Sequence, residues 1–204
     1  MKLHWSPRSP FVRKVMIVAH ETGLAAELDC VRTVAIMNNP NPTLLADNPL
    51  NKIPTLVLNN GIAIYDSRVI CEYLDGLHPG VRLFPPSGQE RLTALRRQAL
   101  GDGLMDLLVL WRGERSRPAE SQSSSHLAAF AVKFRATLAV LEKECGALGG
   151  DNFGIGHVAI GCALSYLDFR FGEESWRAGC PGLAAWHETF EMRPSAKATQ
   201  IVDA

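Results

Sequence analysis

The chain changes its pattern at residues 78–88, and this change limits the folds that it can adopt. Before this segment, short strand-like runs alternate with helical spacing; after it, only helical spacing remains. The segment carries Pro79, Pro85 and Pro86, which favour a linker. With 204 residues, the chain is long enough for two small domains. The sequence therefore predicts an α/β domain over residues 1–77 and an all-helical domain over residues 89–204.

The first 77 residues predict a small mixed sheet. Strands are expected over residues 2–5, 28–34, 55–58 and 62–65, and helices over residues 10–22 and 66–77, with at most a short helix near residues 43–46. Asn59-Asn60-Gly61 is a strong hairpin signal between the last two strands. The first strand–helix–strand unit should give parallel strands through a right-handed crossover. A four-stranded sheet with helices on both faces resembles a thioredoxin-like domain.

The second half and the composition define the class of protein further. Helices are expected over residues 89–111, 127–144, 158–171 and 183–192.

Lysine plus arginine equals aspartate plus glutamate at 21 each, without a dense basic run, which argues against a nucleic-acid partner. No apolar stretch approaches the ~20 residues that span a bilayer, and the N-terminus lacks the apolar block of a signal peptide. A soluble cytoplasmic protein is expected.

The cysteines and histidines do not predict a metal or disulfide site. Five cysteines are spread along the chain without a CxxC pair, and the six histidines form no HxxxH pair. We expect reduced thiols that are packed as small hydrophobic groups.

Four motifs, in this order, resemble the cytosolic glutathione transferase superfamily. They are SPFVRK at residues 9–14, NKIPTL at 51–56, YDSRVICEYL at 65–74 and SYLDFR at 165–170. The resemblance covers nearly the whole chain and is greatest to bacterial members with a serine at the active position. It implies a thioredoxin-like N-terminal domain, an all-α C-terminal domain, glutathione as co-substrate, no metal, and a homodimer.

Ser9 has two interpretations. Serine followed by proline is a typical start of a helix, because serine caps the free N–H groups and proline suits the first helical position. The resemblance implies that Ser9 instead donates a hydrogen bond to the thiolate of glutathione. Ser6 is the competing serine, although Pro7 favours a turn there. A site made only of backbone donors is the third alternative.

Residues 52–54 are the second candidate segment. An Ile53-Pro54 bond just before a strand can be cis and then marks a tight functional turn. The resemblance implies a cis Pro54, backbone groups of Ile53 that pair with the cysteinyl part of glutathione, and Lys52 near its glycine carboxylate. The structural alternative is an edge strand that starts at Pro54 beside a solvated lysine.

Asp66 and Ser67 precede an apolar helical run, which is a typical N-cap signal. A helix N-terminus also offers free N–H groups to an anion. The resemblance implies that Ser67 binds the γ-glutamyl carboxylate of glutathione and Asp66 its ammonium group. Capping and binding are compatible, because the ligand would use donors that the helix leaves free.

The second substrate is less constrained by the sequence. The resemblance places a small hydrophobic electrophile near the first long helix of the second domain, with Trp5, Leu108 and Trp111 as candidates by position. Packing in a core explains the same residues equally well.

The start of the helix near residue 158 departs from the family pattern. Members usually carry a Ser/Thr-x-x-Asp capping box, whereas this chain has Gly154 and His157. We expect the carboxylate bond of the box to be missing and the second domain to be locally weaker.

The sequence thus predicts a glutathione transferase that activates the glutathione thiol for attack on a hydrophobic electrophile or a hydroperoxide. One alternative is a glutathione-dependent disulfide reductase, which the serine at position 9 disfavours. The other is a binding or regulatory protein that has kept the fold without its activity.

Overall fold

A computed structural model describes residues 1–80 and 82–203. Val81, in the predicted linker, and Ala204, at the end of the predicted second domain, lie outside the described residues. The chain forms two compact units, one of Met1–Arg91 with the segment that begins at Pro194, and one of Leu92–Arg193.

The first unit includes a C-terminal segment that the sequence assigned to the second domain. The Ser195 hydroxyl donates to the Glu21 carboxylate, and the Arg13 guanidinium donates to the Ala196 carbonyl over 3.3 Å. Ser195 and Ala196 are both buried. These contacts join residues about 180 positions apart, which local sequence patterns do not reveal.

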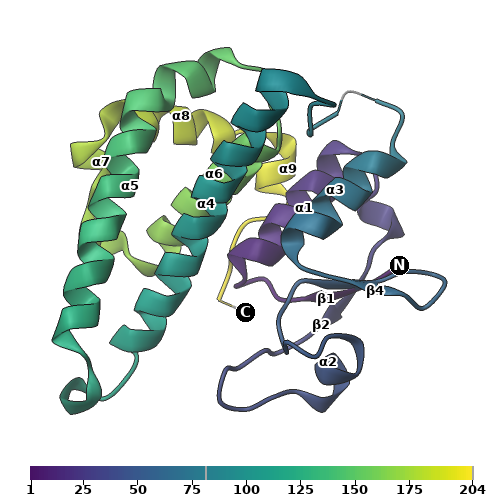
Figure 1. Cartoon of the computed structure of the whole chain (residues 1–204), viewed down its shortest axis with the longest axis horizontal. Helices are drawn as coiled ribbons and strands as arrows, with labels where there is room; N and C mark the ends of the chain where they lie inside the picture. The colour runs from purple at the N-terminus through teal and green to yellow at the C-terminus, as the bar shows by residue number, and fades with distance from the viewer. Residues whose placement is uncertain (81, 204) are drawn as a thin grey trace. The chain divides into compact units, whose positions relative to one another are not determined.

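The first unit is built on a four-stranded mixed sheet, as predicted. Its elements are β1 (Lys2–Trp5), α1 (Pro10–Glu21), η1 (Ala25–Glu27), β2 (Asp29–Arg32), α2 (Pro42–Asp47), β3 (Thr55–Val57), β4 (Ala63–Ile64), α3 (Ser67–Leu77) and α9 (Pro194–Lys197). The strand order is β2-β1-β3-β4, with β1 parallel to β2 and β3 antiparallel to both β1 and β4. Helices α1 and α3 lie side by side on one face, and α2 lies on the other (Figure 1).

Helix α1 has a clear start and end in the sequence. Ser9 is its N-cap and Pro10 its first residue, as the sequence predicted. The helix stops before Gly23, which has a φ of 74°. Glycine takes this left-handed conformation without the steric cost of a Cβ atom, so it is the usual residue after a helix end.

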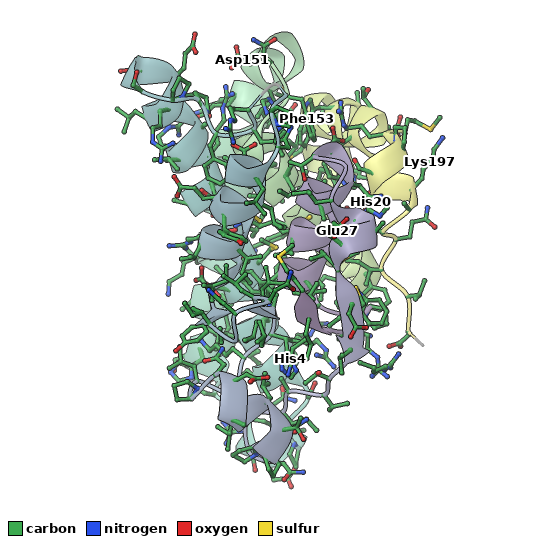
Figure 2. All side chains as sticks on the ribbon, turned by 90° about the vertical axis from the view of Figure 1, so that its right-hand side faces the viewer. His4, His20, Glu27, Asp151, Phe153 and Lys197 are labelled. Carbon is green, nitrogen blue, oxygen red and sulfur yellow. The ribbon has the colours of Figure 1, made fainter. Side chains whose placement is uncertain are left out.

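Charged and polar side chains fasten α2 to the first strand. His4, which is labelled in Figure 2, is buried in β1 and lies 2.8 Å from the Asp47 carboxylate through Nε2. Its Nδ1 lies 2.9 Å from the Thr33 hydroxyl. The Lys2 ammonium donates to the same Asp47 oxygen over 2.6 Å. The hydrogen bond from His4, followed by that from Lys2, lowers the pKa of the Asp47 carboxyl below its ordinary value.

The second unit is helical throughout its described part. Its elements are most of α4 (Gly88–Arg115), η2 (Ala119–Ser121), α5 (Ser124–Gly150), α6 (Ile155–Arg170), η3 (Gly172–Glu174), α7 (Trp176–Gly179) and α8 (Pro181–Glu191). Among the described residues, no helix has both the length and the apolar character that a bilayer crossing needs.

Helix α6 is the core of the second unit, because nearly every residue from Ile155 to Leu167 is buried. Two glycines allow its neighbours to come close. A Cβ atom on Gly101 of α4 would lie 2.5 Å from the Ala159 backbone, and one on Gly161 would lie 2.3 Å from the Phe190 ring. Larger residues at either position would push the helices apart.

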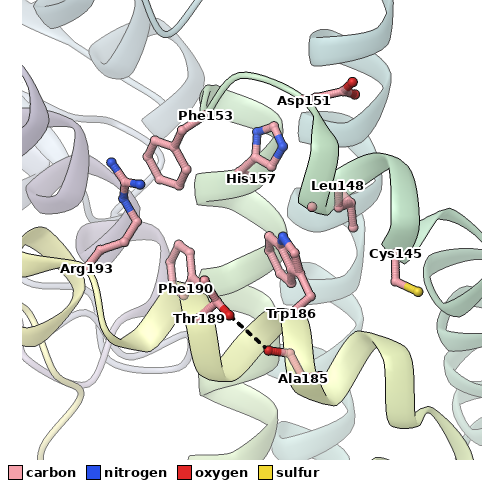
Figure 3. Close-up of a pocket in the computed structure, with 11 residues that line it drawn as sticks. Cys145, Leu148, Asp151, Phe153, His157, Ala185, Trp186, Thr189, Phe190 and Arg193 are labelled. Atoms are coloured by element: carbon pink, nitrogen blue, oxygen red, sulfur yellow. Dashed lines mark hydrogen bonds between the residues drawn. The ribbon is translucent and has the colours of Figure 1, made fainter.

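The structure revises the expectation for the start of α6. The Gly154 N–H donates to Nδ1 of His157 over 3.0 Å, so an imidazole makes the bond that a carboxylate makes in the usual box. The reciprocal half of the box is therefore present, and only the side-chain acceptor at position 154 is missing. His157 lies beside Phe153 and Trp186, and the three line a hollow of about 420 Å³ (Figure 3).

This imidazole cap predicts a pH dependence of stability. Burial, followed by the nearby Arg97 charge, lowers the pKa of His157 below its ordinary value. The unfolded chain therefore takes up the proton first, and stability falls as the pH drops below about 6.5. In His157→Asp the Gly154 N–H would donate to a carboxylate, which stays ionised between pH 7 and 5. We expect the free energy of unfolding of the wild type to fall relative to His157→Asp between pH 7 and 5, measured by urea denaturation.

The matched control is His20→Asn, which replaces an exposed histidine. Its stability should follow the wild type across the same range. Parallel curves for His157→Asp and the wild type would contradict the role of the imidazole.

Candidate functional site

Three chain segments meet at one edge of the sheet. The register pairs His4 with Thr55 and Leu56 with Ile64. Continued by one and two residues, it places Trp5, Pro54 and Asp66 next to one another at the ends of β1, β3 and β4. The N-termini of α1 and α3 follow directly after Ser9 and Asp66. The register therefore places Trp5, Pro54 and Asp66 at the same end of the sheet, and the chain leads from Trp5 to α1 and from Asp66 to α3.

Ser9 caps α1 and keeps a free proton. Its hydroxyl oxygen accepts a hydrogen bond from the Val12 N–H over 3.3 Å, and its own N–H donates to the Ser6 carbonyl over 3.2 Å. A hydroxyl has two acceptor positions and one donor. The capping bond uses one acceptor position, so the hydroxyl proton remains able to bind an anion. The Ser6 hydroxyl accepts a hydrogen bond from the Arg8 N–H over 3.4 Å, which is typical of a serine in a turn.

The Ile53-Pro54 peptide is cis in the structure. Ile53 is half-buried, and its backbone N–H and C=O form no hydrogen bond within residues 1–80 and 82–203. Unpaired backbone groups just before the start of a strand can pair with an extended peptide. Lys52 is exposed next to them.

A buried asparagine that the sequence analysis missed holds this turn. The side-chain amide of Asn48 donates to the Lys52 carbonyl over 3.1 Å and to the Thr55 hydroxyl over 2.9 Å, and its oxygen accepts from the Leu50 N–H. Asn48 and Thr55 are fully buried. The sequence signalled only a loop here, because a local pattern does not show which amide bridges both ends of a turn.

Asp66 and Ser67 form the start of α3. The Asp66 carboxylate caps the helix through the Arg68 N–H over 2.9 Å and is exposed. Ser67 is the first residue of α3, so its N–H has no partner within the helix. Its hydroxyl oxygen lies 3.4 Å from the ammonium of Lys14, a fully buried lysine of α1. The spacing of Phe11, Lys14 and Val18 put this lysine on an apolar helix face, which was the available signal.

The candidates for the second substrate lie in different units. Trp5 is half-buried at the end of β1. Leu108 and Trp111 are buried in the second unit, where the Trp111 ring contacts Phe134 and Phe171 at centroid distances of 5.7 and 5.1 Å. These contacts favour a packing role, and a role in substrate binding stays a prediction.

The remaining titratable groups show no arrangement typical of metal binding. No group of three or more His, Cys, Asp or Glu side chains in the described part of the chain is placed to hold a metal ion. The five cysteines, all within the described residues, form no disulfide bond. Burial raises the pKa of Cys30 and of Cys180, with added repulsion from Asp29 and Glu142 respectively.

Comparisons with known proteins agree with this geometry. The family model "Glutathione S-transferase, N-terminal domain" matches residues 8–77, and "Glutathione S-transferase, C-terminal domain" matches residues 124–189. The Escherichia coli K12 protein YibF, described as an uncharacterized GST-like protein, is 33% identical over 202 residues, which is 98% of each chain. The chain therefore belongs to the glutathione S-transferase family.

Solved structures show the same fold. A glutathione transferase family member from Pseudomonas fluorescens Pf-5, with bound glutathione, is 42% identical over 98% of each chain, with a TM-score of 0.96. A second structure from this organism holds S-(propanoic acid)-glutathione. It is 41% identical, covers 99% of this chain and 100% of that chain, and has a TM-score of 0.89.

The capping bond of Ser9 predicts a loss of stability in Ser9→Ala. Removing an N-cap hydroxyl leaves the Val12 N–H without its acceptor, and such changes cost about 1 kcal/mol. We expect a loss of this size in the free energy of unfolding, measured by urea denaturation. Ser6→Ala is the control and should change stability by less than about 0.5 kcal/mol. Equal stabilities of Ser9→Ala and the wild type would contradict the capping role.

The hydrogen bonds of Asn48 predict a loss of stability in Asn48→Ala, together with a local change in the turn. Asn48→Ala leaves buried partners without hydrogen bonds, which costs about 1–3 kcal/mol. We expect this loss in urea denaturation, together with faster hydrogen exchange at the Leu50 amide, whose bond to the Asn48 side chain is removed. Asn39→Ala, at an exposed asparagine, should leave both properties unchanged. Unchanged exchange in Asn48→Ala would show that other contacts hold the turn.

Proposed function

We propose that this chain is a glutathione transferase. It binds glutathione at the sheet edge, holds the thiol as a thiolate with Ser9, and directs it to a small hydrophobic electrophile or a hydroperoxide. The observation that supports this most is the pair of unused backbone groups of Ile53 beside a cis proline, at the edge where α1 and α3 begin. The glutathione-bound relative supports the choice of ligand.

The dimensions of the edge suit a tripeptide. Neighbouring strands lie about 4.8 Å apart, so Asp66 is about one strand spacing from Pro54, given their register. An extended tripeptide reaches about 10 Å. A ligand whose cysteinyl backbone pairs with Ile53 therefore reaches Ser67 and Asp66 with its γ-glutamyl end and Lys52 with its glycine carboxylate.

The chemistry at Ser9 needs only a hydrogen bond and a helix N-terminus. A free thiol has a pKa of about 8.5 and is only a few per cent ionised at neutral pH. Lowering this pKa by about two units requires about 2.7 kcal/mol. A hydrogen bond to a charged group supplies about 1.5–3 kcal/mol, and the dipole of α1 about 0.3–1 kcal/mol more. The hydroxyl proton that the capping bond leaves free is the donor.

The thiolate then forms a carbon–sulfur bond to an electrophile. In a substitution, the leaving group departs with the electron pair of the bond that breaks; in an addition, the negative charge that develops on the electrophile takes up a proton. Alternatively, the thiolate attacks an oxygen of a hydroperoxide: the O–O bond breaks, the alkoxide leaves and takes up a proton to give the alcohol, and the glutathione sulfenic acid that forms reacts with a second glutathione to give glutathione disulfide and water. The S-(propanoic acid)-glutathione in the related structure is a thioether of glutathione and supports the first route. Trp5, Leu108 and Trp111 remain the proposed residues for the acceptor. The resemblance also supports a cytoplasmic homodimer that acts in detoxification.

Calorimetry of glutathione binding tests the role of Ser9. Titration in two buffers with different ionisation enthalpies gives the number of protons released. We expect the wild type to release a large fraction of a proton near pH 7, because the bound thiol ionises, and Ser9→Ala to release much less. Ser6→Ala is the matched control and should behave like the wild type.

The other outcomes are equally informative. Unchanged proton release in Ser9→Ala would reduce Ser9 to a helix cap and favour backbone donors or Ser6. A wild type that does not bind glutathione would contradict the proposed function and favour a protein that has kept only the fold.

A further inference from the structure

Lys14 is a fully buried lysine beside a residue of the proposed glutathione site. It lies on α1, none of its side chain is exposed, and its ammonium is 3.4 Å from the Ser67 hydroxyl oxygen. Lysine is seldom fully buried, because its charge loses hydration. A buried ammonium directed at a predicted ligand-binding serine therefore calls for an explanation beyond packing.

The contact determines how Ser67 can act. An ammonium donates and does not accept, so the Ser67 oxygen is the acceptor and keeps its own proton. The Ser67 N–H, at the first position of α3, is also free of helical partners. Ser67 thus has two donors for one carboxylate, with a positive charge behind them.

We propose that Lys14 is a positioning residue for the γ-glutamyl carboxylate of glutathione and acts through Ser67. This inference rests on the proposed function. A carboxylate oxygen that accepts from the Ser67 hydroxyl at about 2.7 Å lies no more than about 6 Å from the Lys14 ammonium, given the 3.4 Å contact. The long hydrogen bond is itself weak, but the attraction between charges falls only slowly with distance and is poorly screened in the interior.

The charges around Ser67 also orient the ligand. The Asp66 carboxylate, next to Ser67 in the chain, is exposed, and the Lys14 ammonium beside the Ser67 hydroxyl is buried. The γ-glutamyl group carries an ammonium and a carboxylate on the same carbon atom. Asp66 attracts the first and repels the second, whereas Lys14 does the opposite, so one orientation is favoured over the reverse.

The neighbouring arginine provides a matched control. Arg13 is also buried on α1, but its guanidinium donates to the Ala196 carbonyl, in the C-terminal segment. Arg13→Met removes a buried positive charge that is adjacent to Lys14 in the chain and contacts the C-terminal segment. Lys14→Met removes the charge that faces Ser67, and Lys14→Arg keeps a charge there.

The test compares two ligands by calorimetry. One is glutathione, and the other is 4-aminobutanoyl-cysteinylglycine, which lacks the γ-glutamyl carboxylate but is otherwise the same. We expect the wild type and Arg13→Met to prefer glutathione by a large factor. In Lys14→Met, glutathione should bind at least tenfold more weakly while binding of the analogue changes little, so the preference shrinks. Lys14→Arg should restore most of it.

Other results would overturn the inference. A preference in Lys14→Met equal to that of the wild type would show that Lys14 only packs, even if both affinities fell. If Lys14→Met does not fold, Lys14→Gln, which is polar and uncharged, is measured with the same two ligands and must lose the preference. A wild type that binds neither ligand would contradict the proposed function itself, and a wild type that binds both equally would contradict a role for the carboxylate site.

Discussion

The first unit depends on backbone groups that its own secondary structure leaves unpaired. The ends of β1, β3 and β4 lie at one edge of the sheet, and α1 and α3 begin there. Each helix start exposes N–H groups without intrahelical partners, and the turn at Ile53 adds a free N–H and C=O. In the proposed function a peptide-like anion pairs with these groups, which is how the fold and the proposed ligand are connected.

The polar side chains at this edge serve the fold without using up their binding capacity. Ser9 caps α1 with a lone pair and keeps its proton, and Ser67 accepts from Lys14 and keeps its own. Asn48 holds the turn before Ile53 from within the core. Capping and ligand binding therefore do not compete, and the serines need no general base to act as donors.

The second unit is organised around a buried helix. Neighbouring helices pack close to α6 because Gly101 and Gly161 have no side chain that would hold the helices apart. Its start is closed by the His157 imidazole in place of a carboxylate. This exchange keeps the hydrogen bond but makes it sensitive to protonation, since an imidazole loses its acceptor when it gains a proton.

The sequence by itself determined the element order, the mixed sheet and the cap at Ser9, because these follow from local periodicity, turn residues and short motifs. It missed the short helices α7 and α9, since four residues do not establish a period. It grouped the C-terminal segment with the helical domain, whereas the structure groups it with the first unit, and it did not show that the His157 imidazole would make the bond of the absent carboxylate. Only the tertiary structure brought Lys14 to Ser67, Asn48 to Thr55 and Ala196 to Arg13. These contacts depend on which side chains meet across the fold, and no local pattern in the chain records that.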